Sequence, residues 1–268
     1  MTKCQELFER LVEVIAALRG ENGCPWDKEQ THSTLKSSLL EETYEVIEAI
    51  DADAPLKIKE ELGDLLMQVL LHAQIAQDEN KFNINDVIQT VTEKLIRRHP
   101  HVFGDVQVEN SDQVLSNWEA IKGSEETFQD RKSMMDGIPI QLPSLVRAQK
   151  IQSKASRVGF DWKRGEDVLP KIQEEFEELK DSMGSSEQVD IEMEIGDLLF
   201  SIANLSRFLN VDPENALRKA NVKFIQRFKM MEAEIKRKGK RFEDYDLEGL
   251  DEFWEKVKGK ERNEGKIF

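Results

Sequence analysis

Apolar residues recur along most of the chain with the period of an α-helix. From Leu62 to Ala73 they fall at positions i, i+3, i+4, i+7 and i+11, and the first four of these spacings repeat from Ile195 to Ile202. Alternation of apolar and polar residues, which would indicate a half-buried strand, does not occur over any comparable stretch. The pattern therefore predicts an all-α protein built from amphipathic helices in short antiparallel bundles.

Two acidic motifs occur twice, in the same order. The motif E-x-G-D-L-L begins at Glu61 and again at Glu194, an offset of 133 residues, and an upstream E-E-x-x-E motif places Glu42 and Glu175 at the same offset. A tandem duplication is therefore predicted. The segment between the copies contains several glycine and proline residues, which favour turns and indicate a linker. The expected organisation is an N-terminal domain over residues 1–105, a linker with one helix over 106–143, a second domain over 144–235 and a tail helix over 236–268.

Composition narrows the set of partners. Acidic residues outnumber basic ones by 53 to 38, giving a net charge of -15 at pH 7, so nucleic-acid polymers and anionic membranes should be repelled. The longest apolar stretch is too short to span a bilayer, and the N-terminus lacks a signal-peptide core. Cys4 and Cys24 have neither the spacing of a disulfide framework nor that of a zinc site. A cytoplasmic protein is expected.

The acidic motifs predict a metal site in each copy. Helical residues three positions apart lie about 60° apart around the axis, so each motif presents two carboxylates beside its apolar stripe. Two packed helices would bring four together, and a hard divalent cation would offset their repulsion. The expected ligands of Mg²⁺, with Mn²⁺ as a substitute, are Glu175, Glu178, Glu194 and Asp197 in the second copy and Glu42, Glu45, Glu61 and Asp64 in the first. Acidic pairs also occur on solvated helix faces, but ordered duplication favours a site.

Two other features bear on a ligand. Lys219, Lys223 and Arg227 recur every four residues on one predicted helix face, with Asn221 between them, and they would either receive phosphates or form a solvated face. Arg97 and Arg98 occupy the comparable place in the first copy. A glycine lies inside each E-x-G-D-L-L motif, where it costs about 1 kcal/mol in a helix, so close approach of a helix or ligand is expected at both.

The ordered segments resemble the tandem-domain MazG family of nucleoside triphosphate pyrophosphohydrolases over nearly the whole chain. The segments that carry the resemblance are "NGCPWDKEQTHSTLKSSLLEETYEVIEAI", "EELGDLLMQVLLHAQIAQ", "KLIRRHPHVFGD", "RAQKIQSKASRVGFDW", "EIGDLLFSIANLSRFL" and "ALRKANVKFIQRF". The resemblance implies an all-α NTP pyrophosphatase fold, a homodimer, and Mg²⁺ held by the acidic motifs of a hydrolytic second domain. It places substrate contacts at Lys219, Lys223 and Arg227, and also at Lys122 and Trp254.

The expected reaction converts a nucleoside triphosphate, ATP included, and water to the monophosphate and pyrophosphate, over a broad range of ribo- and deoxyribonucleotides. The metal would neutralise the triphosphate and activate water, and Glu174 or Glu178 would accept the proton. The first domain would be structural, regulatory or catalytic. The alternative function is a non-catalytic helical module that binds a nucleotide or a partner.

Overall fold

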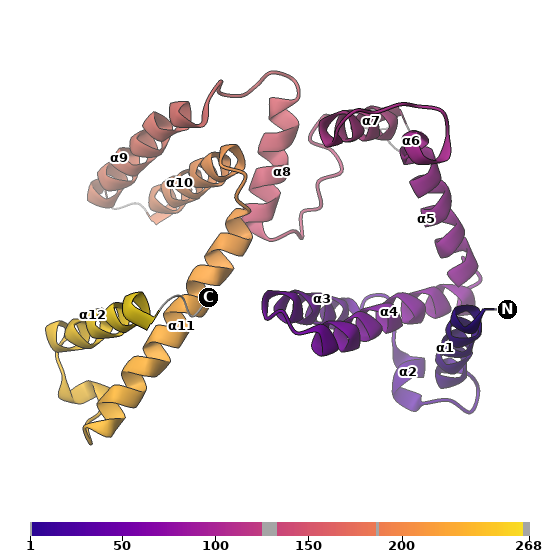
Figure 1. Cartoon of the computed structure of the whole chain (residues 1–268), viewed down its shortest axis with the longest axis horizontal. Helices are drawn as coiled ribbons and strands as arrows, with labels where there is room; N and C mark the ends of the chain where they lie inside the picture. The colour runs from indigo at the N-terminus through magenta and orange to yellow at the C-terminus, as the bar shows by residue number, and fades with distance from the viewer. Residues whose placement is uncertain (1, 125–132, 186–187, 265–268) are drawn as a thin grey trace. The chain divides into compact units, whose positions relative to one another are not determined.

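The computed structural model describes residues 2–124, 133–185 and 188–264, and all regular structure within these ranges is helical. The prediction of an all-α fold is therefore confirmed. The chain divides into two compact units, Met1–Gln129 and Asp130–Phe268, each of which contains one copy of the duplicated motifs (Figure 1). None of the described helices combines the length and the apolar character needed to cross a membrane.

Unit 1 is organised around the pair α3 and α4. Helix α1 and the short helix α2 precede this pair, α1 packs on α4, and α5 packs on both α4 and α7. The helices of this unit are α1 (Lys3–Arg19), α2 (Pro25–Glu29), α3 (Lys36–Asp51), α4 (Pro55–Asp78), α5 (Ile84–Arg98), α6 (Pro100–Phe103) and α7 (Ser111–Ser124). Helix α7 falls within residues 106–143, the range predicted to be a linker with one helix, and it belongs to unit 1.

The core of unit 1 holds α1 against α4. It consists of Ile15 from α1, Leu35 just before α3, and Leu70, Leu71 and Ile75 from α4. At the edge of this core the Arg19 guanidinium lies 2.8 Å from the Asp78 carboxylate and donates to backbone carbonyls of the α2 segment. Apolar burial and this ion pair together fix α4, which carries Glu61 and Asp64.

Unit 2 repeats the helix pair as α9 and α10. Helix α8 packs on α10, and α11 packs on α12. The elements are α8 (Ser144–Ser156), η2 (Gly165–Val168), α9 (Leu169–Ser185), α10 (Gln188–Phe208), α11 (Pro213–Arg237), η3 (Phe242–Asp244) and α12 (Leu247–Glu264). The C-terminal tail predicted over 236–268 therefore contains the end of α11, a 3₁₀ turn and α12.

Two features position the helices of unit 2. Met231 and Ile235 of α11 pack against Phe253 and Val257 of α12, which folds the C-terminal helix back onto α11. A Cβ atom at Gly165 would lie 3.0 Å from the Cβ atom of Phe208, so glycine allows η2 to approach the end of α10 closely.

The apolar stripes recognised in the sequence do not all face the cores. Leu62, Leu66 and Val69 are exposed on α4, whereas Leu70, Leu71 and Ile75 are buried. Helix α4 therefore has two apolar faces, only one of which is covered within the unit. The exposed face recurs on α10 at the same offset of 133 residues, as Ile195, Leu199 and Ile202.

Within the described residues no other helix approaches the two motif glycines, and the approach of a ligand there stays a prediction. No atom other than local helix backbone lies within 4 Å of a Cβ atom built at Gly63 or at Gly196. Each glycine instead faces open space beside its exposed apolar stripe.

Candidate functional site

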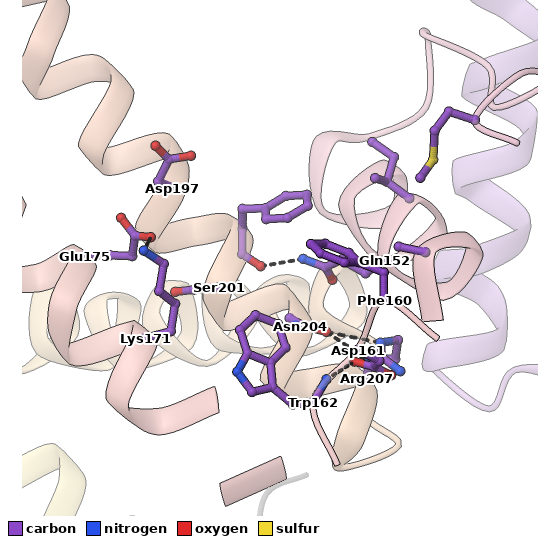
Figure 2. A pocket seen from close by; sticks show the side chains of 14 residues that line it. Gln152, Phe160, Asp161, Trp162, Lys171, Glu175, Asp197, Ser201, Asn204 and Arg207 are labelled. Carbon is purple, nitrogen blue, oxygen red and sulfur yellow. Dashed lines mark hydrogen bonds and ion pairs between the residues drawn. The ribbon is translucent and has the colours of Figure 1, made fainter. Parts of the chain in front are cut away.

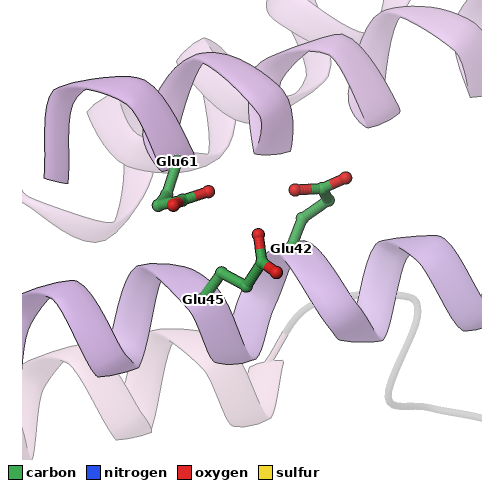
Figure 3. Close-up of side chains that lie close together, drawn as sticks. All are labelled: Glu42, Glu45 and Glu61. Carbon is green, nitrogen blue, oxygen red and sulfur yellow. The ribbon is translucent and has the colours of Figure 1, made fainter. Parts of the chain in front are cut away.

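In unit 1 the packing of α3 on α4 brings three carboxylates together. Glu42 and Glu45 from α3 and Glu61 from α4 each offer an oxygen atom, and these oxygens lie within 4.8 Å of one another (Figure 3). Glu61 is buried, and burial followed by the neighbouring Glu45 raises its pKa above the ordinary range. Burial and the charge of Asp64 likewise raise the pKa of Glu42. The cluster therefore concentrates negative charge that nearby protein groups only partly offset.

In unit 2 the equivalent helices form a second cluster. Glu175 from α9 and Glu194 and Asp197 from α10 bring carboxylate oxygens within 4.8 Å of one another, and Glu175 is buried. Lys171, one turn before Glu175, places its ammonium 2.8 Å from Glu175 and 2.9 Å from Glu174. Hydrogen bonds to these two carboxylates raise the pKa of Lys171. Unit 1 has Ser38 at the equivalent position, so this cation belongs to the second copy.

The fourth predicted carboxylate of each copy lies near its cluster but outside the group of three. Burial, then the charges of Glu175 and Glu194, raise the pKa of Glu178. In unit 1 the fourth carboxylate is that of Asp64, whose charge raises the pKa of Glu42. Both clusters offer hard oxygen donors, partly buried and with excess negative charge, which is the donor set that suits Mg²⁺. The residues present therefore fit the predicted metal.

Beside the carboxylates of unit 2 lies a cavity of about 300 Å³. Its floor is one face of α10, where Asp197, Ser201 and Asn204 follow one another at intervals of three or four residues. Glu175, Asp197 and Lys171 lie on one side, with Gln152, Asp161 and Arg207 on the other (Figure 2). Apolar and aromatic side chains complete the lining, namely Met135, Ile151, Ala155, Phe160, Trp162 and Phe200.

The polar groups at the far side of the cavity are held in a fixed arrangement. Arg207 forms an ion pair of 2.5 Å with Asp161 and donates two hydrogen bonds to the side-chain oxygen of Asn204. The Gln152 amide nitrogen donates to the Phe200 carbonyl oxygen over 2.7 Å. Gln152 and Asn204 are both buried, so their orientations are set by protein partners rather than by solvent.

The predicted substrate contacts lie on other elements. Lys219, Asn221 and Lys223 are exposed on α11, and the Arg227 guanidinium lies 5.8 Å from the ring centroid of Trp254 on α12. None of these five residues lines the cavity.

The remaining predicted contacts belong to unit 1. The Lys122 ammonium on α7 lies 4.9 Å from the ring centroid of Trp118, and the Arg98 guanidinium at the end of α5 lies 5.1 Å from the same centroid. Arg97 is exposed beside Arg98. These assignments stay predictions.

Sequence reasoning missed six polar residues around the cavity, namely Gln152, Asp161, Lys171, Ser201, Asn204 and Arg207. The ion pair of Lys171 could have been predicted from sequence, because a lysine four residues before a glutamate on a helix favours an ion pair. Gln152 and its partner Phe200 are 48 residues apart, and Asp161 and Arg207 are 46 apart. No helical period connects residues at such separations, so these contacts emerge only from the fold.

The crowding of carboxylates in unit 1 leads to a stability prediction. Replacing Glu61 by Gln removes a charge that the folded state disfavours, so the melting temperature in chelator at pH 7 should rise by about 2–4 °C. Because the folded-state pKa of Glu61 is raised, the gain should be complete above that pKa and vanish once the pH falls below the ordinary carboxyl range. Glu13→Gln on exposed α1 is the control. An unchanged or lower melting temperature for Glu61→Gln at pH 7 would contradict the account.

Comparison with known proteins identifies the family. The model of the MazG nucleotide pyrophosphohydrolase domain matches residues 30–103 and 163–231, one segment in each unit. The chain is 53% identical over 253 residues to the nucleoside triphosphate pyrophosphohydrolase/pyrophosphatase MazG of Thermotoga maritima, covering 94% of this chain and 96% of that protein. It is 45% identical over 257 residues to the nucleoside triphosphate pyrophosphohydrolase of Escherichia coli K12, covering 95% and 98%.

A protein of the same name from Mycobacterium tuberculosis is 35% identical over 230 residues, which cover 85% of this chain and 59% of that longer protein. The likeness thus extends through both units, and the family expected from the acidic motifs is confirmed. With more than half of its 268 residues matched by the family model and near-complete coverage by relatives, the chain belongs to the MazG nucleotide pyrophosphohydrolase family.

Proposed function

We propose that this protein hydrolyses nucleoside triphosphates to the monophosphate and pyrophosphate, and that unit 2 carries the reaction. Relatives that match almost the entire chain bear the name nucleoside triphosphate pyrophosphohydrolase. The observation that carries the assignment to unit 2 is the carboxylate cluster of Glu175, Glu194 and Asp197, which opens onto a cavity of about 300 Å³. A phosphate chain at the carboxylates and a nucleoside in the cavity would fit this arrangement.

In unit 2 one group of residues would bind the metal and another would bind the phosphates. Glu175, Glu194 and Asp197 would hold Mg²⁺, or Mn²⁺ in its place, with Glu178 as a fourth ligand from the adjacent turn of α9. When bound, the metal supplies charge neutralisation for the triphosphate and lowers the pKa of water.

Cationic side chains would bind the phosphates. Lys171 orients Glu174 and Glu175 through its two ion pairs and adds a positive charge beside the cluster. The cationic face of α11, formed by Lys219, Lys223 and Arg227, would stabilise charge on the phosphates as the bond breaks, with Asn221 as a hydrogen-bond donor.

The two candidate proton acceptors have different surroundings. The Glu174 carboxylate is 2.9 Å from the Lys171 ammonium and is held in an ion pair. Glu178 forms no ion pair with another described residue. This geometry favours Glu178 as the group that accepts a proton from water, and Glu174 as a residue that helps to position Lys171.

Unit 1 fits a structural or regulatory role better than a catalytic one. Its four acidic positions are the same as those of unit 2, and two of the three clustered carboxylates, Glu42 and Glu61, match Glu175 and Glu194. However, Ser38 replaces Lys171, and the positions of Asn204 and Arg207 are taken by Leu71 and Gln74. Leu71 is buried in the core of unit 1. The binding of a cation or nucleotide without turnover is therefore the candidate function for this unit.

A homodimer is the proposed assembly. Ile195, Leu199 and Ile202 form an exposed apolar stripe on α10, at helical positions i, i+4 and i+7. Exposed apolar surface of this kind favours association, and Gly196 beside it leaves room for a second helix. We propose that the stripe packs against the same stripe of a second copy across a twofold axis.

The reaction is tested by incubating the protein with Mg²⁺ and a panel of ribo- and deoxynucleoside triphosphates, and identifying the products by chromatography. Monophosphate and pyrophosphate should form, and chelation should abolish their formation. Glu175→Gln should lower the rate by about 100-fold or more, because the lost group would contribute several kcal/mol through the metal.

Glu177→Gln is the matched control, because Glu177 lies on the same helix, is exposed and pairs with Lys180. It should leave the rate within about twofold of the wild type, as is usual for an exposed site. Diphosphate and phosphate as products would refute cleavage between the α and β phosphates. The absence of turnover over the whole panel would favour the binding module.

The assembly is tested by analytical ultracentrifugation. The wild-type protein should sediment with the mass of two chains, whereas Leu199→Arg should shift it towards the mass of one chain, because a charge in the apolar stripe opposes association. Leu247→Arg, at the exposed start of α12, is the control and should leave the dimer intact. A wild-type mass of one chain would contradict the proposal.

A further inference from the structure

We propose that the cavity of unit 2 is a nucleobase pocket in which Gln152 and Asn204 hydrogen-bond the edge of the base. This inference rests on the proposed function, since it assigns a binding site to the base, the part of the substrate that the carboxylates do not bind. The residues that carry it lie on α8 and α10, outside the acidic motifs and the cationic face of α11.

Gln152 supplies a buried acceptor without a partner. Its residue exposure is 6%, and its amide nitrogen donates to the Phe200 carbonyl oxygen over 2.7 Å. Because a carbonyl can only accept, this bond fixes which end of the amide faces Phe200. The Gln152 side-chain oxygen is left buried with no hydrogen-bond partner among the described residues, which is a costly state for a protein to maintain. An N–H group of a ligand in the cavity would satisfy it.

Asn204 supplies the complementary donor. Its side-chain oxygen accepts two hydrogen bonds from Arg207, of 3.1 and 2.9 Å, and Arg207 is itself held by Asp161. A guanidinium can only donate, so the oxygen of Asn204 must face Arg207. The amide nitrogen of Asn204 is then the group left to donate to a ligand. One acceptor and one donor match the edge of any common base, each of which carries both kinds of group.

The rest of the cavity suits a flat aromatic ligand. Its surface is mostly apolar, with Ile151 and Ala155 from α8 and the aromatic side chains Phe160 and Trp162 in the segment between α8 and η2. Aromatic side chains stack on bases, and this contact is worth about 1–3 kcal/mol per base in nucleic-acid complexes. Figure 2 shows Phe160 beside Gln152, and Trp162 near Asn204.

The spacing along α10 connects the base pocket to the carboxylates. Asp197 and Asn204 are seven residues apart on one helix, which at 1.5 Å per residue separates their backbones by about 10 Å. Ser201 lies between them on the cavity floor. A sugar would occupy this middle stretch, with its 5′-phosphate directed to Glu175 and Asp197.

Unit 1 gives an internal comparison. Leu71, at the position of Asn204, packs in a core cluster with Ile15, Leu35, Leu70 and Ile75. The carboxylate motifs are therefore duplicated, whereas Asn204 of the cavity is replaced in the first copy by a leucine of the core.

The test measures binding without hydrolysis. Nucleoside 5′-monophosphates and ribose 5-phosphate, which lacks the base, are titrated into the full-length protein with Mg²⁺ by isothermal titration calorimetry. At least one monophosphate should bind 10-fold or more tightly than ribose 5-phosphate. Gln152→Leu should remove most of this advantage, because it deletes the hydrogen-bonding amide and keeps an apolar side chain of similar size.

Gln149→Leu is the matched control, because it makes the same substitution one turn earlier on α8, where Gln149 donates to the Val211 carbonyl and does not line the cavity. It should bind the monophosphates as the wild type does. Asn204→Leu, which installs the residue found in unit 1, is the second test variant, and thermal melting establishes which variants remain folded.

Two results would overturn the inference. One is a wild-type protein that binds no monophosphate more tightly than ribose 5-phosphate, a comparison that needs no variant. The other is a folded Gln152→Leu or Asn204→Leu protein that keeps the full advantage of the monophosphate. Either result could occur while the wild type still releases pyrophosphate, so failure of the base pocket is distinguishable from failure of the proposed reaction.

Discussion

The mutual repulsion of carboxylates at a helix–helix contact is the constraint on which this structure depends. In each unit two packed helices place three acidic side chains with oxygens within 4.8 Å of one another, one of them buried. Such an arrangement costs stability unless cations offset it. The hydrophobic core of unit 1 and the Arg19–Asp78 ion pair hold α4 in place against this cost. A contact between neutral side chains at this place would stabilise the helix pair more. The carboxylates lower the stability of the helix pair but suit the binding of a cation.

The two copies offset the repulsion differently, and this difference separates their roles. In unit 2 Lys171 lies against Glu175, and the adjoining face of α10 is polar and borders a cavity. In unit 1 the equivalent face carries Leu71, which is packed into the core. The same acidic motif is therefore coupled to a cavity of nucleoside size in one copy and to an apolar core in the other.

Much of the fold could be predicted from sequence because the patterns that specify its helices involve residues close together in the chain. The helical period, the duplicated motifs and the three-residue spacing of carboxylates led to the helix pairs and to three members of each acidic cluster. The period could not distinguish the covered face of α4, with Leu70, from the exposed face with Leu66, since both are apolar. The cost of glycine in a helix likewise could not tell whether Gly63 faces a neighbouring helix or, as the described residues show, open space.

The cavity could not be predicted, because its contacts join residues that are distant in sequence. Gln152 meets Phe200, and Asp161 meets Arg207, through the packing of α8 and the η2 segment against α10. No periodic pattern encodes such pairs. The segments that carry the family resemblance contain these four residues, but the resemblance assigned them no role in the site.

The central claim is that the second carboxylate cluster performs the hydrolysis and the first does not. The most direct measurement compares pyrophosphate release by Glu194→Gln and Glu61→Gln, which make the same substitution at equivalent positions of the repeat. The account predicts a loss of about 100-fold or more for Glu194→Gln and a rate within about threefold of the wild type for Glu61→Gln. An equal loss in both variants, or a loss confined to Glu61→Gln, would contradict it.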